Sequence, residues 1–410
     1  MAPRTPAPVE KVKLSDKHIP LRIAATIFFM VVGASALAYA ISNFFTGTKG
    51  WREIGTLESD GITCAQDFSF MYNVGSDRSV SAENRELTEI YSHSAKRAYE
   101  LFNTSEIEGV VNIATINASP NTDITVDAVL YEAFEKILKS GDRTVFLGPV
   151  YEIYNGLFRI EFKEAAVDYD PRLNSDLAKI FERLCGYASD SSSVDIVLLE
   201  DGKVRLFVSQ EYESFLESNE LTNILDFSWM KNAFIIDYFA KEISSAGYKN
   251  GAISSNDGFS VNLGGEDTSF TVFHMCKDGV YPIGVMNYSG TRSIVYLRDY
   301  LLSETDSERY FVLENGEIRT PYIDISDGLC RSSARDMTAY SDDFSCADIV
   351  LRISRLYISR EFDESLVDLI RSSGIQLIYG DDSKVYYTDS QSPFGELFKE
   401  SSHIRVEKAK

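Results

Sequence analysis

Apolar and polar side chains follow helical spacing in the stretch 225–249, near the middle of the chain. Apolar residues recur there every three or four positions, at Phe234, Ile235, Tyr238, Phe239 and Ile243. Asp237 and Lys241 fall on the opposite side, and Gly247 is typical of a helix end. We therefore expect a short buried segment that leads into an amphipathic helix. By itself, this pattern indicates an ordinary core helix.

The same patterning predicts the other elements. Helical periodicity is found at 83–102, 125–139, 176–184, 348–356 and 364–373. Runs typical of strands are found between 259 and 296, around Asn315-Gly316, and at 62–74, 195–199, 203–208, 376–379 and 384–388. The aromatic segment 143–162 is expected to be loop-rich and to line a cleft. Because no βαβ rhythm is present, the expected class is α+β, with a mostly antiparallel sheet packed with helices.

Residues 23–45 form an apolar run without a charge. A helix of this length reaches about 34 Å, enough to cross a bilayer. The segment before the run carries more basic than acidic residues, which places the amino terminus in the cytoplasm and the rest of the chain outside. The rival interpretation is a cleaved secretory signal, because Ala38-Tyr39-Ala40 fits a cleavage site. The long basic leader and long apolar run favour a retained, single-pass membrane anchor.

These observations divide the chain into five parts. We expect a cytoplasmic tail at 1–22, a transmembrane helix at 23–45, and a tether with the first strand at 46–83. One large mixed domain outside the membrane follows at 84–390, and a carboxy-terminal tail at 391–410 ends the chain.

The charge and cysteine content exclude several classes of protein. A net charge of −22 repels nucleic acid, so we expect no nucleic-acid partner. The five cysteines are scattered and contain no CxxC pair, so neither a disulfide scaffold nor a structural zinc site is expected. A single disulfide between Cys330 and Cys346 remains open. His274, close to Cys276, is expected to be a hydrogen-bonded sheet histidine rather than a ligand or base.

Five segments together resemble a known family. They are TSEIEGVVN at 104–112, GDRTVFLGPVYEIYNGLF at 141–158, LDFSWMKNAFIID at 225–237, GEIRTPYIDISDG at 316–328 and CADIVLR at 346–352. Their order and pattern resemble the FAD:protein FMN transferases, the ApbE-type family once described as thiamine-biosynthesis lipoproteins. The resemblance covers about 84–388. It implies an extracytoplasmic domain that binds FAD and, with Mg²⁺, transfers FMN to a Thr or Ser hydroxyl of a target protein.

The resemblance also identifies candidate site residues. It aligns Asp226, Asp237, Asp324 and Asp348 with aspartates of the family motifs. The implied cofactor-binding positions are Asp226, Ser228, Trp229, Asn232 and Asp324. The implied metal ligand is Asp348, which in the family acts with a threonine and a backbone carbonyl.

Several motif positions differ from the family. Ser228 and Trp229 replace a glycine pair, Asn232 replaces a lysine, Pro321 replaces a histidine and Arg352 replaces the metal-binding threonine. A tryptophan in place of glycine either fills the cofactor space, stacks on the cofactor, or simply packs in the core.

An arginine cannot bind Mg²⁺, which requires oxygen ligands. Asp348 and Arg352 are four residues apart on a predicted helix, so we hypothesise that Arg352 supplies the positive charge that Mg²⁺ would bring. An ordinary exposed helix pair is the alternative.

We therefore expect a membrane-anchored, FMN-transferase-like protein with a degenerate catalytic site. It would act as an interaction or scaffold subunit with a protein partner outside the membrane, near flavin-based electron transfer. One alternative is an active transferase in which Asp348, Asp324 and Asp226 hold the metal. Another is an FAD-binding module without transfer. FAD and Mg²⁺ are the cofactors of the active forms, and the degenerate form needs none.

Overall fold

A computed structural model describes residues 48–57, 61–76, 78–302, 306, 309–381 and 383–409. The tail expected at 1–22 and the transmembrane helix expected at 23–45 lie outside these residues. Within the described ranges, no helix is both long and apolar enough to cross a bilayer.

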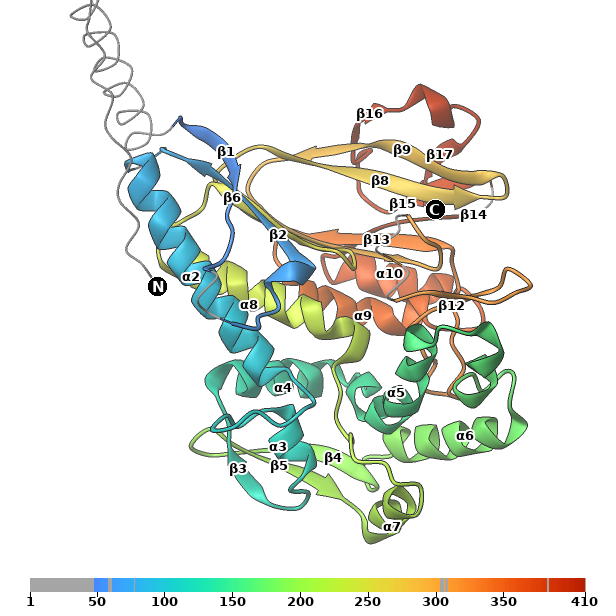
Figure 1. The fold of residues 1–410 in the computed structure, drawn as a ribbon. Helices are drawn as coiled ribbons and strands as arrows, with labels where there is room; N and C mark the ends of the chain where they lie inside the picture. Colours follow the sequence, from blue (N-terminus) through green and yellow to red (C-terminus); the bar gives the residue numbers. More distant parts are fainter. Residues whose placement is uncertain are drawn as a thin grey trace, which may run out of the picture.

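A nine-stranded sheet forms the centre of the molecule (Figure 1). Every neighbouring pair in it is antiparallel except the last, β15 with β17. Its strands, in spatial order, are β1 (Gly50–Glu53), β2 (Phe68–Val74), β6 (Gly251–Ser255), β7 (Phe259–Leu263), β10 (Thr291–Arg298), β13 (Asp336–Ser341), β14 (Gln376–Asp381), β15 (Lys384–Tyr387) and β17 (Arg405–Lys408). The predicted α+β class with a mostly antiparallel sheet is confirmed.

The two faces of this sheet are covered differently (Figure 1). A small sheet lies on one face, made of β16 (Phe394–Leu397), β9 (Gly279–Tyr288) and β8 (Thr268–Cys276). It buries its own apolar cluster against the central strands. Helices cover the other face, namely α2 (Val80–Leu101), α8 (Lys231–Ser245), α9 (Cys346–Tyr357) and α10 (Glu364–Ser372).

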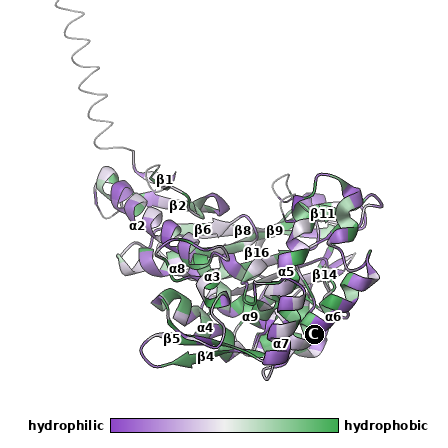
Figure 2. Ribbon diagram, turned by 60° about the horizontal axis from the view of Figure 1, so that its bottom comes forward, coloured by the Kyte–Doolittle hydropathy of each residue, from purple (hydrophilic) through white to green (hydrophobic). Residues whose placement is uncertain are grey.

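A second group of elements packs under these helices. It holds α3 (Ile113–Asn117), α4 (Ala128–Ser140), α5 (Gly148–Tyr154), α6 (Ser175–Ser189), α7 (Gln210–Ser218) and a three-stranded sheet of β3 (Asp123–Thr125), β5 (Lys203–Val208) and β4 (Val194–Leu199). One continuous apolar core joins this group to the central sheet. Hydrophobic and hydrophilic residues alternate along most helices, as expected of elements with one buried side (Figure 2).

Local hydrogen bonds explain where the predicted helices begin. The helix expected at 83–102 begins at Val80, because the Ser79 hydroxyl accepts a hydrogen bond from the Ala82 N–H. The helix expected at 125–139 begins at Ala128, because Asp127 caps it and β3 ends at Thr125. Pattern alone located both helices to within three residues.

Two segments differ from expectation. The segment 143–162 is mostly helical rather than loop-rich, and contains η3 (Thr144–Leu147), α5 and η4 (Asn155–Arg159). Residues 391–410 were expected to form a tail. Instead, their described part adds β16, η8 (Lys399–Ser401) and β17 to the two sheets.

The cysteines and His274 also have defined surroundings. All five cysteines lie within the described ranges and are buried, and none is in a disulfide, so the disulfide considered between Cys330 and Cys346 is not formed. His274 is a hydrogen-bonded sheet histidine, as predicted. Its Nδ1 lies 2.9 Å from an oxygen of Asp336, and its Nε2 lies 2.7 Å from the backbone oxygen of Asp381.

Candidate functional site

The stretch 225–237 forms a buried turn, a short 3₁₀ helix η6 (Ser228–Met230) and the start of α8. The Asp226 carboxylate accepts a hydrogen bond from the Ser228 N–H at 2.7 Å, and burial raises the pKa of Asp226. Ser228 has a φ of 44°, a left-handed conformation that favours glycine. The backbone therefore keeps the shape of a glycine turn although Ser228 replaces the family glycine.

Trp229 enters the core rather than an open site. Its side chain is 8% exposed and packs edge-on against Tyr322, with ring centroids 5.1 Å apart. Tyr322 packs in turn against Tyr357 at 5.2 Å. These three residues, which we call the aromatic cluster, link the segment 225–237 to the segment 316–328. The indole Nε1 lies beside the Tyr151 hydroxyl without an aligned hydrogen bond.

The other expected cofactor-binding residues are tied to the chain itself. The Asn232 amide donates to Asp257 at 2.9 Å, and burial raises the pKa of Asp257. Asp324 accepts a hydrogen bond from the Ser326 N–H at 2.8 Å and lies 2.9 Å from a guanidinium nitrogen of Arg331. Asn232 and Asp324 thus each have a different polar partner within the chain.

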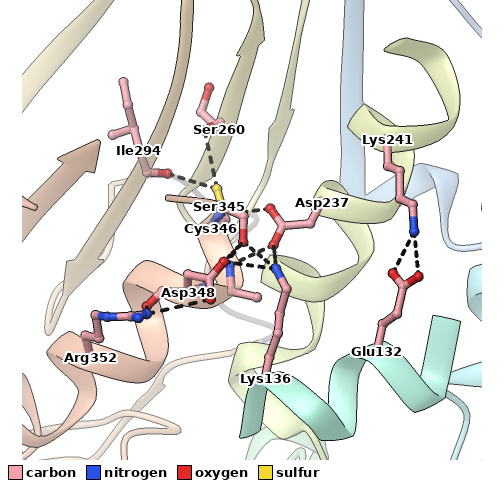
Figure 3. A network of polar contacts seen from close by, with 11 residues as sticks. Glu132, Lys136, Asp237, Lys241, Ser260, Ile294, Ser345, Cys346, Asp348 and Arg352 are labelled. Carbon is pink, nitrogen blue, oxygen red and sulfur yellow. Dashed lines mark hydrogen bonds and ion pairs between the residues drawn. The ribbon is translucent and has the colours of Figure 1, made fainter. Parts of the chain in front are cut away.

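Two other aspartates do converge, at the amino terminus of α9 (Figure 3). Asp237 of α8 accepts hydrogen bonds from the backbone N–H groups of Cys346 at 2.9 Å and Ala347 at 3.0 Å. Asp348 of α9 accepts one from the hydroxyl of Ser345 at 2.7 Å. Ser345 also caps α9, because its oxygen accepts the Asp348 N–H at 3.3 Å. Anionic groups are stabilised at a helix amino terminus, which explains why both carboxylates gather there.

The positive charge between these carboxylates comes from Lys136 of α4. Its Nζ lies 3.1 Å from Asp348 Oδ2, 3.4 Å from Asp237 Oδ2 and 2.6 Å from Ser345 Oγ (Figure 3). No sequence pattern identifies this residue as part of the site. Lys136 is separated from Asp237 by 101 positions and from Asp348 by 212, and nothing in the pattern of its helix distinguishes it from a surface lysine.

The pKa shifts of Lys136 and Asp348 favour their ionised forms, whereas that of Asp237 does not. Burial tends to lower the pKa of Lys136, but the charges of Asp237 and Asp348 outweigh it and raise that pKa. Burial tends to raise the pKa of Asp348, but Lys136, Ser345 and Arg352 bring it below its usual value. For Asp237, which is more deeply buried, the effect of burial prevails and the pKa is raised.

Arg352 lies at the outer side of Asp348. Its Nη1 donates to the backbone oxygen of Asp348 at 2.6 Å and is 3.6 Å from Asp348 Oδ1. Its guanidinium also lies over the ring of Phe344, 4.5 Å from the centroid. The predicted pair with Asp348 is therefore present, but the cation between the two carboxylates is Lys136 rather than Arg352.

These residues do not fit Mg²⁺. Mg²⁺ is often held by one or two carboxylates, with water completing its six oxygen ligands, but here the Lys136 ammonium lies between the two carboxylates where the ion would bind. Each carboxylate oxygen already faces a donor, and the charges of Lys136 and Arg352 balance those of Asp237 and Asp348. Among the described residues, no group of three or more His, Cys, Asp or Glu side chains is arranged to hold a metal ion.

Nor do the expected flavin-binding residues fit FAD. Trp229 is packed on Tyr322, Asn232 is bound to Asp257, and Asp324 is paired with Arg331. Two buried atoms in this region, Trp229 Nε1 and Asn232 Oδ1, lack an aligned partner within the described part of the chain. These two atoms offer FAD one hydrogen-bond donor and one acceptor, fewer than its phosphates, ribityl chain and ring system would require.

The molecule is thus an α+β protein whose central antiparallel sheet lies between a helical layer and a small second sheet. This is the fold of the ApbE flavin transferases. The chain is similar to the ApbE protein of Thermotoga maritima, with a TM-score of 0.55 and 14% identity over 81% of this chain and 94% of the other. It is also similar to the flavin transferase ApbE of Vibrio cholerae, with a TM-score of 0.53 and 13% identity over 80% and 95%. No protein-family model and no curated protein sequence matches the chain.

Proposed function

We propose that this chain is a non-catalytic protein with the ApbE fold, which acts by binding a protein partner outside the membrane rather than by transferring FMN. The observation that carries this proposal is the position of Trp229. A family glycine pair leaves open space beside the backbone, whereas Trp229 fills that space and is buried against Tyr322.

The chemistry of phosphoryl transfer supports the same conclusion. Such reactions depend on positioning the phosphates and neutralising their charge. In this chain, the carboxylates of Asp237 and Asp348 are neutralised by Lys136 and Arg352, and Pro321 and Asn232 stand where the family has a histidine and a lysine. The chain lacks the side chains that would carry out the transfer at these positions.

We further propose that residues 23–45 anchor the protein in the cell membrane with the folded domain outside, near flavin-based electron transfer. The uncharged apolar run and the basic residues before it support this topology. Protease protection of the full chain in sealed vesicles tests it. The fold should be digested from the outer side only, and digestion from the cytoplasmic side would overturn the topology.

The central test is a titration with FAD, with and without Mg²⁺. The chain has two tryptophans, so Trp51→Phe leaves Trp229 as the single indole reporter. We expect FAD to lower its fluorescence no more than it lowers that of Trp51 alone in the Trp229→Phe variant. Inner-filter effects are the same in both variants and cancel.

Each outcome distinguishes the candidate functions. The absence of saturable quenching supports the proposal. Saturable quenching that requires Mg²⁺, followed by flavin transfer to a Thr-containing target peptide, would establish an active transferase. Saturable quenching without transfer would establish an FAD-binding module, for which the unpartnered Asn232 Oδ1 would be the first contact to test.

A further inference from the structure

We propose that Lys136 is a built-in cation that replaces a divalent metal ion between Asp237 and Asp348, and that its removal opens a latent divalent-cation site. This inference rests on the proposed function, because it explains why a chain with this fold needs no metal ion.

The arrangement around Lys136 is that of a cation site rather than a surface ion pair. Three oxygen-bearing side chains converge on its Nζ within 3.4 Å, from Asp237, Ser345 and Asp348. Carboxylate and hydroxyl oxygens are the groups that hard cations bind. The ammonium lies where the oxygen atoms of these three side chains converge (Figure 3).

A nearby ion pair shows that a lysine between these helices does not always have several oxygen-bearing partners. Lys241 of α8 and Glu132 of α4 join the same two helices, with Nζ 2.7 Å from the carboxylate (Figure 3). Both side chains are at least half exposed, and the lysine has one acidic partner. Lys136 has two acidic partners and a hydroxyl, and its side chain is 32% exposed. The Lys241–Glu132 pair therefore provides a matched control.

Removing the ammonium of Lys136 would leave the two carboxylates with too little positive charge. Without Lys136, the only remaining cation described at the site is Arg352, which lies 3.6 Å from the outer oxygen of Asp348. Asp237 would then keep its two backbone N–H donors but face no positive charge. Two carboxylates so close together repel each other, and a divalent ion with bound water is the natural replacement.

Because Lys136 is part of the chain, its positive charge at this site does not depend on a bound metal ion. Its side chain extends from α4 to the facing ends of α8 and α9, so one residue connects three helices. A metal ion would connect the same helices only when bound. The tethered ammonium gives this connection at any metal concentration.

The experiment measures metal binding in the full-length protein without flavin, so its outcome is independent of the FAD titration. Lys136→Ala, Lys136→Ala/Arg352→Thr and Lys241→Ala are titrated with Mn²⁺ by electron paramagnetic resonance, and their melting temperatures are measured with and without Mg²⁺. We expect the double variant to bind Mn²⁺ at least about tenfold more tightly than the wild type and to melt at a higher temperature with Mg²⁺.

Adding Asp348→Asn to the double variant should abolish the gain, and Lys241→Ala should show none. If Lys136→Ala does not fold, Lys136→Gln keeps the length of the side chain, removes the charge and serves in its place. A folded double variant without Mn²⁺ binding would overturn the proposal. Tight Mn²⁺ binding by the wild type that depends on Asp348 would also overturn it.

Discussion

At the scale of single residues, two lysines between α4 and α8 have different surroundings. Lys241 reaches one exposed glutamate, while Lys136 is inserted between two aspartates, of which Asp237 also accepts two backbone hydrogen bonds. Exposed ion pairs contribute little to stability because water screens them. Breaking a largely buried pair leaves a carboxylate without its partner, which costs much more.

We therefore predict that Lys136→Met lowers the free energy of unfolding by about 2–3 kcal/mol. Lys241→Met should lower it by less than about 0.5 kcal/mol. Urea unfolding followed by circular dichroism measures both. Equal losses in the two variants would show that Lys136 is an ordinary surface lysine.

Ser345 is expected to contribute more than a helix cap. Its oxygen caps α9 at 3.3 Å, as Ser209 caps α7 at 3.3 Å, but Ser345 also contacts Lys136 and Asp348. Ser209→Ala should cost about 1 kcal/mol of unfolding free energy. Ser345→Ala should cost about 1 kcal/mol more, because it also removes a hydrogen bond to each charged neighbour. Thermal unfolding of the two variants compares them, and equal costs would contradict a role for Ser345 beyond capping.

At the scale of elements, His274 connects the small sheet to the central sheet. It lies on β8 and contacts Asp336 of β13 and the backbone of Asp381 at the end of β14. Burial tends to lower the pKa of His274, but Asp336 and the Asp381 carbonyl outweigh it and raise that pKa. A histidine whose pKa is raised by folding stabilises the fold fully below its unfolded pKa of about 6.5. This contribution is lost as the pH rises through the folded pKa.

Replacing His274 should therefore destabilise the protein more in acid than in alkali. We predict that His274→Asn lowers the free energy of unfolding by more at about pH 5.5 than at about pH 9. His403, which lies against Tyr281, provides the control substitution His403→Asn. A loss for His274→Asn that does not change with pH would contradict the pKa shift.

The last strands are predicted to be required for the stability of both sheets. β17 pairs with β15, β16 pairs with β9, and Ile404 is buried in the apolar cluster between the sheets. A chain that ends at residue 390 should lose at least about 3 kcal/mol of unfolding free energy and bind a hydrophobic dye, because burial of Ile404 and two strand pairings are lost. A chain that ends at Lys408 keeps both strands and serves as the control. Unchanged stability on truncation at 390 would mean that 391–410 behave as a tail.

The elements that sequence analysis found have strong local signals. The helices were located because their apolar spacing extends over many residues, and β4 and β5 because 195–199 and 203–208 are runs typical of strands. β16 and β17 have four residues each and pair with strands distant in the sequence, so no local pattern identifies them. The segment 143–162 was missed because its turns are short and change between 3₁₀ and α geometry.

The site was only partly predictable for a similar reason. Asp348 lies in a segment that resembles a family motif and was predicted as a metal ligand, whereas Asp237, also in such a segment, was expected on the water-facing side of its helix. Lys136 lies on a helix without such a motif, and its role depends on the packing of α4 against α8 and α9. Trp229 was recognised as a replacement for glycine, but its contact with Tyr322 could be found only from the fold.

At the scale of the whole molecule, the fold is that of the ApbE flavin transferases, and our proposal concerns how its chemistry differs. The central sheet and helical layer match ApbE structures over about four-fifths of this chain at 13–14% identity. Chains with so few identical residues can share a fold because the same elements still pack together, whereas function depends on the residues of the site. Under the proposed function, the aromatic cluster and Lys136 supply apolar and charge-neutralising contacts in place of those that a flavin and a metal ion would make.

The most direct test of this account is a calorimetric titration of the wild-type chain with FAD in the presence of Mg²⁺. The Trp229→Gly/Lys136→Ala/Arg352→Thr variant, in which the filling indole and both cations are removed, is titrated in parallel. We predict no saturable heat for the wild type up to millimolar FAD, and measurable binding for the variant if it remains folded. Saturable, Mg²⁺-dependent binding of FAD by the wild type that is lost in Asp348→Ala would contradict the account.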